Sequence, residues 1–491
     1  MTGSIEGIVK ALNEAGQLRQ HPVQLPEIAG VTEDSRRVER GWLFCAIVGS
    51  TDDGHRHVAD AAERGAAAAL VSRVVDSPLP QVLVRDGRMA TAIAAAQWYG
   101  RPGARLRLIG VTGTNGKTTT VALVRHLFGA AGDAGSVGTL GALDGANRSL
   151  EGHGALTTPG AVELQAVLAE LVTRGVRTVA MEASSHALDQ RRLETLTLAG
   201  AVFTNLTHDH LDYHRDLDAY RAAKARLAGL VGAGGVAALN ADAESWGTLQ
   251  VPAAVRRVRF GYAAEAEVRV ERVDFGTSGS SVSVAFGDER VQCLLPLIGA
   301  FNVSNALGAA AIAWGLGMTP DDIAGRLATA PQVPGRMERV GRMDQPFLIV
   351  RDYAHTPDAL ERAIEAVRQL TRGRLVVLFG AGGDRDRSKR PLMGAIAARG
   401  ADLAVVTSDN PRTEDPAAIV REIREGMGGT DHLAIVDREE AIHRAVAMLE
   451  SGDTLLLAGK GHETYQVVGT VKRPFDERVI VGAALAARSA A

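Results

Sequence analysis

Cysteine is scarce in this chain, which has only Cys45 and Cys293 among its 491 residues. Two cysteines so far apart support neither a disulfide framework nor a cysteine zinc site, and both are more typical of buried apolar positions. An uninterrupted apolar run of about 20 residues is also absent, and the first residues lack a cationic start followed by an apolar core. We therefore expect a cytoplasmic protein that does not insert into a membrane.

The chain also lacks an excess of either charge. Its formal net charge is -3, with Lys and Arg interspersed among Asp and Glu. This balance argues against nucleic acid or a membrane surface as the main partner. The length indicates roughly three domains, and a hydrophobic content of 46% is enough for several ordinary cores. We expect a monomer without a nucleic-acid partner.

Short β-rich runs alternate with Ala/Leu-rich amphipathic runs along most of the chain, which is typical of βαβ units and mainly parallel sheets. Pro and Gly at 101–103 and 333–335 predict boundaries that divide the chain into residues 1–103, 104–336 and 337–491. Between about 255 and 297 the alternation of short strands predicts an antiparallel insertion. The sequence therefore predicts an α/β protein of three domains.

The stretch GTNGKTT, residues 113–119, joins an apolar segment at 106–111 to a helix-like run at 118–128. Backbone N–H groups of such a turn can cradle phosphate oxygens, the helix N-terminus adds positive charge, and a Lys and a Thr can meet phosphate and Mg²⁺. The spacing differs from a standard P-loop, so a turn that merely needs glycine is the alternative. The order of strand, Gly-Lys-Thr and helix favours an ATP site formed by Gly113, Thr114, Asn115, Gly116, Lys117, Thr118 and Thr119.

A nucleotide site also needs a carboxylate for its metal, and Glu182 ends the apolar run VRTVAME in the position of a Walker-type acid. Farther along, THDHLDYH at 207–214 gathers histidines and aspartates. Their spacing fits no standard structural zinc pattern. Oxygen ligands with one imidazole suit Mg²⁺ or Mn²⁺ better, so the cluster favours a magnesium site.

The last third of the sequence repeats one arrangement four times, a buried-type strand followed by a polar loop. In open α/β sheets ligands bind beyond the carboxyl ends of the strands, so the four loops are expected to face one crevice. Loops that are polar only because they are solvated are the alternative. The polar side chains in question are Asp352, His355, Arg385, Asp409, Arg412, His462 and Glu463.

With these motifs the chain resembles the Mur ligases, the bacterial enzymes that form amide bonds in peptidoglycan precursors, and their E member in particular. GTNGKTT, MEASSHALDQRR, FTNLTHDHLDYH, GAFNVSNAL, VPGRMERV, DYAHTP and DNPRTEDP occur in the family order over the whole chain. GTNGKT alone would also admit folylpolyglutamate synthetases and cyanophycin synthetase. SSHALDQRR and DNPR favour the Mur ligases.

The resemblance implies a UDP-binding N-terminal domain, a central ATPase domain with a P-loop, and a Rossmann-like C-terminal domain that binds the amino acid. It implies transfer of the ATP γ-phosphoryl group to the carboxylate of a UDP-N-acetylmuramoyl dipeptide, followed by attack of an amine on the acyl phosphate. The residues implied in catalysis are Lys117, Glu182, His210 and Lys224. The implied metal ligands are Thr118, Glu182, His210 and Lys224 as a CO₂-derived carbamate, and further ATP contacts are Asn302, Asn305, Arg336 and Asp352.

By the same resemblance, the segment DSRRVERGWLFCAIVGSTDDG would meet the uridine. The implied contacts with the UDP-linked substrate are Glu33, Ser35, Ser50, Thr51 and Asp52, and Thr157, Thr158, Ser184, Gln190 and Arg192 at its peptide end. Arg192 is a natural partner for a carboxylate or phosphate.

The DNPR loop resembles the version in enzymes that add meso-diaminopimelate, whose second carboxylate needs a bidentate donor such as Arg412. The residues implied for this amino acid are Arg385, Asp409, Asn410, Pro411, Arg412, Gly459 and Glu463. A surface charge that only caps a helix is the alternative for Arg412. A lysine-adding ligase, a folylpolyglutamate-synthetase-like ligase and a non-catalytic nucleotide switch are the alternatives for the whole protein.

Overall fold

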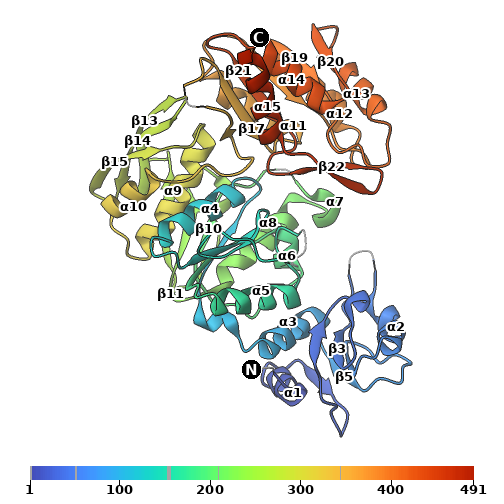
Figure 1. Cartoon of the computed structure of the whole chain (residues 1–491). Helices are drawn as coiled ribbons and strands as arrows, with labels where there is room; N and C mark the ends of the chain where they lie inside the picture. Colours follow the sequence, from blue (N-terminus) through green and yellow to red (C-terminus); the bar gives the residue numbers. More distant parts are fainter. Residues whose placement is uncertain (1–2, 50–51, 152–155, 208, 343, 491) are drawn as a thin grey trace. The chain divides into compact units, whose positions relative to one another are not determined.

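The computed structural model describes residues 3–49, 52–151, 156–207, 209–342 and 344–490. The chain divides into two compact units. Unit 1 comprises Met1–Arg269, Ala285–Glu289 and Ser304–Ile323, and unit 2 comprises Val270–Val284, Arg290–Val303 and Ala324–Ala491. Figure 1 shows unit 1 mainly in blue and green and unit 2 mainly in orange and red. The predicted boundaries near residues 103 and 336 remain predictions. Among the described residues, no helix is long and apolar enough to cross a membrane.

The first sheet of unit 1 has the strand order β1-β5-β4-β3-β2, and only β1 runs antiparallel to its neighbour. Helix α1 covers part of it because its apolar residues recur at helical spacing, and Ser4 caps its first turn by accepting from the Gly7 N–H. The strands are β1 Leu18–Gln20, β2 Gly30–Thr32, β3 Trp42–Cys45, β4 Ala68–Val71 and β5 Gln81–Val84. The helices are α1 Ile5–Glu14, α2 Val58–Glu63 and α3 Gly87–Trp98.

The central sheet of unit 1 has the order β12-β11-β10-β6-β9-β7-β8, and its pairings are parallel except for the β7–β8 hairpin. The strands are β6 Arg107–Thr112, β7 Ala134–Gly138, β8 Gly141–Leu143, β9 Thr178–Glu182, β10 Leu198–Phe203, β11 Val231–Asn240 and β12 Arg256–Gly261. The helices along this part of the chain are α4 Lys117–Phe128, α5 Ala161–Thr173, α6 Ser185–Asp189, α7 Leu211–His214, α8 Leu217–Ala225, α9 Ala300–Gly315 and α10 Pro320–Leu327.

The prediction of an antiparallel insertion over 255–297 is wrong for its first strand. β12 pairs with β11 in parallel, and the start of β13 pairs with β12 in parallel. Alternating residues show only that one face of a strand is exposed, and the edge of a parallel sheet gives the same pattern. Two-residue connections, which only antiparallel strands allow, follow between β13 Val268–Gly276, β14 Gly279–Phe286 and β15 Glu289–Leu295.

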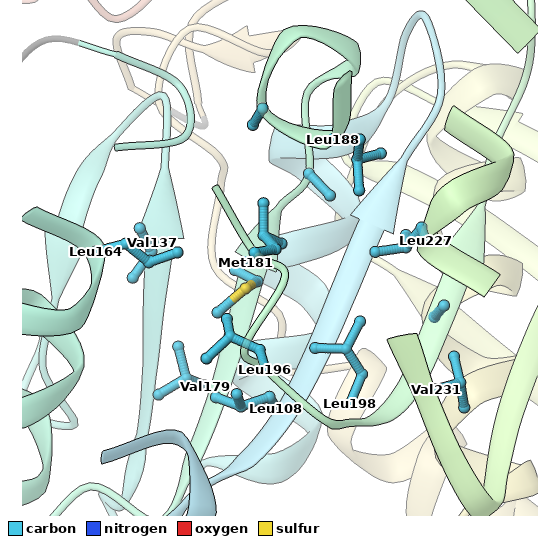
Figure 2. Packing of buried hydrophobic residues seen from close by; sticks show 14 of the residues in the cluster. Leu108, Val137, Leu164, Val179, Met181, Leu188, Leu196, Leu198, Leu227 and Val231 are labelled. Atoms are coloured by element: carbon cyan, nitrogen blue, oxygen red, sulfur yellow. The ribbon is translucent and has the colours of Figure 1, made fainter. Parts of the chain in front are cut away.

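One hydrophobic core of the central sheet packs on one face of β6, β9 and β10, whose opposite face is also buried. Leu108, Val179, Met181 and Leu198 are at most 1% exposed. Figure 2 shows their side chains gathered with those of the neighbouring helices, which include Leu188 and Leu227. Such runs of buried residues on neighbouring parallel strands leave the polar groups of this region to the strand ends.

The main sheet of unit 2 has the order β16-β17-β21-β18-β19-β20. All its pairings are parallel except that of β16, so the prediction of a parallel sheet with four strand-end loops is confirmed. Successive residues of β18 enter two different cores, because helices cover both faces of the sheet. The strands are β16 Glu338–Arg339, β17 Leu348–Asp352, β18 Leu375–Phe379, β19 Leu403–Val406, β20 His432–Ala434 and β21 Thr454–Ala458.

A separate hairpin, β22 Tyr465–Val468 and β23 Val471–Pro474, follows β21. The helices of unit 2 are α11 Pro357–Arg368, α12 Lys389–Gly400, α13 Pro416–Glu425, α14 Arg438–Ala447 and α15 Glu477–Ala490.

One fully buried ion pair connects α14 with α15. Arg438 and Glu477 have 0% side-chain exposure and lie 2.8 Å apart. The Arg438 guanidinium also donates to the carbonyls of Ser408 and Ala458, which follow β19 and end β21. This arginine therefore satisfies backbone acceptors beside two of the polar loops.

Replacing Arg438 with Met should destabilise unit 2 strongly, because the Glu477 carboxylate would stay buried without its countercharge. Removal of one partner from a buried pair costs about 3–5 kcal/mol. Urea unfolding followed by circular dichroism measures the loss. Arg342→Met is the control, because Arg342 forms an exposed pair with Asp344, and it should leave the transition unchanged. Equal transitions for the two variants would contradict the prediction.

Candidate active site

The turn between β6 and α4 is held in place by the strand end of β10. The Thr114 N–H donates to the Asn205 carbonyl at 2.8 Å, and the Asn115 N–H donates to the Asn205 Oδ1 at 2.9 Å. Gly113 and Gly116 have positive φ of 146° and 86°. A Cβ at Gly113 would lie 1.9 Å from the Thr204 hydroxyl. These glycines are therefore required by backbone conformation and close approach, as in a loop that must fold tightly around a ligand.

Two lysines meet at the carbonyl of Gly113. The Lys117 ammonium donates to the carbonyls of Gly113 and Thr114 at 2.9 and 2.8 Å, and the Lys224 ammonium donates to the Gly113 carbonyl at 2.7 Å. Lys224 is 1% exposed, and its ammonium lies 4.5 Å from the centroid of the Tyr220 ring. The structure thus brings together two of the residues predicted for catalysis.

The environment of Lys224 disfavours its charged form. Burial lowers the pKa of the Lys224 ammonium well below its usual value, and the positive charge of Lys117 lowers it further. Asp209 acts in the opposite direction. Burial and the neighbouring cation therefore both favour the neutral amine over the ammonium.

Glu182 ends β9 and is 1% exposed. Both of its carboxylate oxygens accept from Thr139, one from the N–H at 2.8 Å and the other from the hydroxyl at 3.2 Å. Thr139 follows β7, and a Cβ on Gly138 would lie 2.4 Å from the Glu182 Oε1. The β7–β8 turn therefore fixes this carboxylate beside the phosphate loop, because β9 and β6 are paired.

The residues predicted for the peptide end of the substrate form one cluster next to Glu182. Thr158 donates to the Glu182 carbonyl at 2.8 Å and to the Ser184 hydroxyl at 3.2 Å. Arg192 donates to the Thr158 carbonyl at 2.6 Å and to the side-chain oxygen of Gln190 at 2.6 Å. Thr157 lies 3.3 Å from the Thr139 hydroxyl.

His210 lies in an aromatic group rather than in a compact set of metal ligands. Its ring is 4.9 Å from His186 and 6.2 Å from Tyr220, and its backbone has a positive φ of 53°. Within the residues that the structure describes, three or more His, Cys, Asp or Glu side chains nowhere come together in a way that could hold a metal. His208 lies outside the described residues. The role of His210 as a metal ligand stays a prediction.

The residues predicted for the uridine are less concentrated. The Glu33 carboxylate lies at the N-terminus of α5, where a Cβ on Gly160 would lie 1.9 Å from its Oε1. Desolvation raises the pKa of Glu33, while Arg192 opposes this rise. Ser35 begins a short 3-10 turn, and Asp52 is exposed and lies 2.7 Å from His57. Ser50 and Thr51 lie outside the described residues.

The two asparagines predicted for ATP occupy successive turns of α9. Asn302 is 0% exposed and donates its amide to the Ile298 carbonyl at 2.9 Å. Asn305 adjoins the phosphate loop, because a Cβ on Gly116 would lie 2.2 Å from its Oδ1. Thr118 and Thr119, at the start of α4, are 7% and 3% exposed.

In unit 2, Arg336 and Asp352, both predicted to contact ATP, lie close enough for their charges to interact. The Asp352 carboxylate accepts from the N–H groups of Met337 and Ala354 at 2.8 and 2.9 Å. Desolvation raises the pKa of Asp352, and the charge of Arg336 opposes the rise. The Arg336 guanidinium lies 4.7 Å from the centroid of the Tyr353 ring.

The four strand-end loops of unit 2 contact one another. The Tyr353 ring lies 5.2 Å from the His462 ring, and the Lys389 ammonium donates to the His355 carbonyl at 2.9 Å. The Gly383 N–H donates to the Asn410 carbonyl at 2.9 Å. The Asn410 amide also donates a hydrogen bond to the Glu463 carboxylate at 2.8 Å. The loops after β17, β18, β19 and β21 therefore form one polar region.

The loop at 409–412 is fastened on two sides. Hairpin β22–β23 holds its backbone, because the Arg412 N–H donates to the Val467 carbonyl at 3.0 Å and the Gly469 N–H donates to the Arg412 carbonyl at 2.7 Å. On the other side, the Arg412 guanidinium donates to the Gly383 carbonyl at 2.7 Å. Arg412 and Asp384 both adopt positive φ, 50° and 51°, which this double attachment stabilises.

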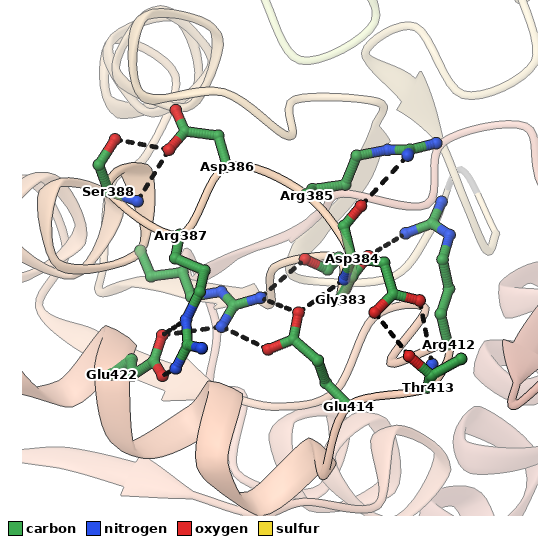
Figure 3. Close-up of polar contacts among 12 residues, drawn as sticks. Gly383, Asp384, Arg385, Asp386, Arg387, Ser388, Arg412, Thr413, Glu414 and Glu422 are labelled. Carbon is green, nitrogen blue, oxygen red and sulfur yellow. Dashed lines mark hydrogen bonds and ion pairs between the residues drawn. The ribbon is translucent and has the colours of Figure 1, made fainter.

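Figure 3 shows how the loops after β18 and β19 are joined. Asp384 accepts from the N–H and hydroxyl of Thr413, and its own N–H donates to Glu414 at 2.6 Å. Arg390, which is 0% exposed, bridges Glu414 and Glu422. With the loops so joined, the side chains of Arg385 and Arg412 extend to the same side of the figure.

Sequence reasoning missed Thr139, Lys460, Asp384 and Arg390. Lys460 is fully buried, and its ammonium donates to the Asn410 Oδ1 at 2.9 Å and to Glu463 at 3.2 Å. A lysine between two glycines directly after the buried strand DTLLLA is a signal that could have identified it. The hydroxyl and backbone contacts of Thr139 have no such signal in the sequence.

The sequence is similar to ligases of known name over nearly its whole length. It is 43% identical over 471 residues to the UDP-N-acetylmuramoyl-L-alanyl-D-glutamate–2,6-diaminopimelate ligase of Geobacillus kaustophilus, covering 94% of this chain and 96% of that protein. It is also 43% identical over 475 residues to the ligase of the same name from Brucella melitensis, covering 94% and 95%. The chain belongs to the Mur ligase family. Residues 27–97 match the Mur ligase family catalytic domain, 111–313 the Mur ligase middle domain, and 335–461 the Mur ligase glutamate ligase domain.

Solved structures of Mur ligases share this fold. A structure of a UDP-N-acetylmuramoyl-L-alanyl-D-glutamate–2,6-diaminopimelate ligase superposes with a TM-score of 0.72 at 31% identity, covering 100% of both chains. MurF ligase from Thermotoga maritima in complex with ADP has a TM-score of 0.61 at 19% identity, covering 93% of this chain and 96% of that one. The second likeness concerns the fold alone.

The position of Lys117 predicts that Lys117→Ala abolishes turnover without unfolding the protein. The ammonium binds the loop that would face the transferring phosphoryl group, and its loss removes the charge there. Activity is measured as phosphate release from ATP, and circular dichroism checks the fold. A folded variant with more than about a tenth of the wild-type kcat, a loss under about 1.4 kcal/mol, would contradict this role.

Proposed function

We propose that this Mur ligase adds meso-diaminopimelate to UDP-N-acetylmuramoyl-L-alanyl-D-glutamate and converts ATP to ADP and phosphate in the same reaction. The observation that carries the proposal is the joined pair of loops after β18 and β19, which brings Arg385 and Arg412 to Gly382 and binds Glu463 through Asn410. The chain that carries these loops is 43% identical over 94% of its length to ligases of that name. The product would be a peptidoglycan precursor. We propose Glu33, Ser35 and Asp52 as contacts with the UDP-linked substrate.

The reaction begins with a carboxylate, which resists nucleophiles because of its negative charge. A carboxylate oxygen attacks the γ-phosphorus of ATP, and the bond from that phosphorus to the oxygen of ADP breaks. The amine nitrogen then attacks the acyl carbon, phosphate leaves, and the nitrogen loses a proton. Both steps depend on positioning and on electrostatic stabilisation of phosphoryl oxygens.

The first step fits unit 1. Lys117, the N–H groups at the start of α4 and the Thr118 hydroxyl would bind the phosphates. The cluster of Thr158, Ser184 and Arg192 lies beside Glu182 and would orient the carboxylate that is phosphorylated. Arg192 supplies the cation that this carboxylate needs.

The donors near the loop fit magnesium rather than zinc. Thr118 supplies a hydroxyl and Glu182 a carboxylate, and neighbouring cysteines are absent because Cys45 and Cys293 belong elsewhere in the chain. Mg²⁺ bound there would neutralise charge on the phosphate oxygens. His210, which packs against His186 and Tyr220, would be a further ligand of the magnesium ion. Thr139 would keep both oxygens of Glu182 oriented toward the loop.

Lys224 fits the proposed carbamate. Its amine is buried, its pKa is lowered, and it lies at the phosphate loop through Gly113. Reaction of a neutral amine with CO₂ forms an N–C bond and releases a proton, which replaces a cation by an anionic oxygen ligand. The negative charge would then attract both Lys117 and Mg²⁺.

The second step fits unit 2, where the loops would bind the amino acid that attacks. Arg336 and Asp352 would reach the nucleotide. Asn410, Pro411 and Gly459 would line this amino-acid site. Gly459 is required there because a Cβ would lie 2.4 Å from the Asp409 carboxylate. A distal ammonium would meet Glu463, and a distal carboxylate would meet Arg385 and Arg412.

Phosphate release from ATP tests the function directly. The assay contains UDP-N-acetylmuramoyl-L-Ala-D-Glu with meso-diaminopimelate, with L-lysine or with no amine. We expect fast release only with meso-diaminopimelate. Release with L-lysine at equal efficiency would establish the lysine-adding alternative, and ATP binding without amine-dependent release would establish a nucleotide switch.

The carbamate predicts that Lys224→Ala is nearly inactive and is partly rescued by acetate, since a small carboxylate can replace the missing oxygen ligand. Lys224→Arg should not be rescued, because Arg fills the space and keeps a positive charge. Steady-state phosphate release with and without acetate measures both variants. Full activity of Lys224→Ala would rule the carbamate out.

The Arg412 side chain predicts a change of specificity in Arg412→Ala. Loss of a charge-assisted pair in a partly buried site costs on the order of 2–4 kcal/mol, or roughly 30-fold to 1000-fold in kcat/KM for meso-diaminopimelate. The KM for ATP should change little, and lysine should gain relative to diaminopimelate. Arg387→Ala is the control, because Arg387 is an exposed cation of the neighbouring loop. An unchanged ratio of the two amines would remove Arg412 from the specificity argument.

A further inference from the structure

Lys460 is a buried cation inside the proposed amino-acid site. It is the second residue after β21 and is flanked by Gly459 and Gly461, whose φ values are 113° and 51°. A Cβ on Gly461 would lie 2.5 Å from the Tyr353 Cβ. These two glycines let the backbone turn so that the lysine side chain enters the interior, where it has 0% exposure.

The Lys460 ammonium fixes which way the Asn410 side chain faces. The Asn410 Oδ1 accepts from Lys460 at 2.9 Å and from the Val467 N–H at 2.9 Å. Because both partners are donors, the end of the amide that faces them must be the acceptor oxygen and not the NH₂ group. The Asn410 Nδ2 must then face Glu463, to whose Oε2 it donates at 2.8 Å.

The same ammonium fixes Glu463. It donates to the Glu463 Oε2 at 3.2 Å, so this one oxygen accepts from both Asn410 and Lys460. Among the residues that the structure describes, hydrogen bonds hold this carboxylate by Oε2, and its Oε1 would accept from an incoming donor. Asp409 lies 3.8 Å from the ammonium on the other loop.

The charges in this bonded group sum to one negative charge, from Asp409, Glu463 and Lys460. Lys389, whose charge also acts on Asp409, is turned to the His355 carbonyl. Arg385 and Arg412 lie on the loops after β18 and β19, which are joined to this group through Asn410. An amino-acid head group carries one ammonium and one carboxylate, and the site offers a negative and a positive side to match it.

We infer that Lys460 is a positioning residue that sets the specificity of the site. It holds the side chains of Asn410 and Glu463 in fixed positions, and it limits the net charge of Asp409, Glu463 and Lys460 to a single negative charge. The inference rests on the proposed function, since it assumes that these loops bind the amino acid. Without Lys460 the group would carry two negative charges, which repel a distal carboxylate but not a distal ammonium. Selection of diaminopimelate over lysine would weaken.

A purely structural role of Lys460 would have a different signature. It would lower stability and the amount of active enzyme, while the KM for each substrate and the ratio of the two amines would stay as in the wild type. Kinetic constants for separate substrates therefore distinguish the two roles.

The test uses the full-length enzyme and Lys460→Met, which keeps the volume and removes the charge. We expect the KM for meso-diaminopimelate to rise at least roughly tenfold, as for a lost hydrogen bond to a charged group. The KM for ATP and for the UDP-linked substrate should change less than about twofold, and the diaminopimelate-to-lysine ratio of kcat/KM should fall roughly tenfold. If Lys460→Met does not fold, Lys460→Gln is measured in the same way.

Arg374→Met is the matched control. Arg374 binds the buried Asp453 at 2.8 Å, at the opposite end of β21, so the variant also leaves a buried carboxylate without its cation. It should lower the melting temperature without changing the KM for diaminopimelate or the amine ratio. Unchanged values in the Lys460 variant, or equal shifts in Arg374→Met, would overturn the inference. Absence of diaminopimelate-dependent turnover in the wild type would instead overturn the proposed function.

Discussion

Cationic side chains that bind backbone carbonyls hold the loops of this protein at the carboxyl ends of its parallel strands. Lys117 binds the carbonyls of Gly113 and Thr114, Arg390 and Arg412 bind those of Gly382 and Gly383, and Arg438 binds those of Ser408 and Ala458. A buried carbonyl without a donor is costly, and so is a buried cation without an acceptor. Each pairing satisfies both needs at once. The loops can therefore be irregular and buried.

This constraint also prepares the loops for anions. A lysine that donates to two carbonyls in a glycine turn already points its charge into the turn, and a phosphate can take over those donors without moving the backbone. The same holds in unit 2, where the guanidinium of Arg412 is fixed by one nitrogen at Gly383 and has further donors for a carboxylate. Binding then costs little reorganisation, which is the condition for strong electrostatic stabilisation.

Much of this arrangement could be predicted from the sequence. Apolar runs ending in polar loops indicated the parallel strands β6, β9, β17, β18, β19 and β21, because buried strands and strand-end polar residues are both visible as composition. GTNGKTT indicated the turn between β6 and α4, because its glycines stand between a buried strand and a helix. The strand β12 was misjudged, since its exposed alternate residues fit either sheet direction. Contacts made through backbone groups, as between Thr139 and Glu182, depend on a hairpin turn whose register the residue types do not determine.

Lys460 shows where such prediction stops in physical terms. A lysine is usually exposed, and its flanking glycines mark a tight turn after a buried strand but not a side chain at 0% exposure among two carboxylates and an amide. Its burial depends on two loops, those after β19 and β21, that meet only in the folded sheet. The cost of burying the cation is offset only if its three partners on these loops are present together. Removing any one of the three partners leaves the cation under-compensated. The residues proposed to select the amino acid and Lys460, which binds them, are therefore constrained as one group.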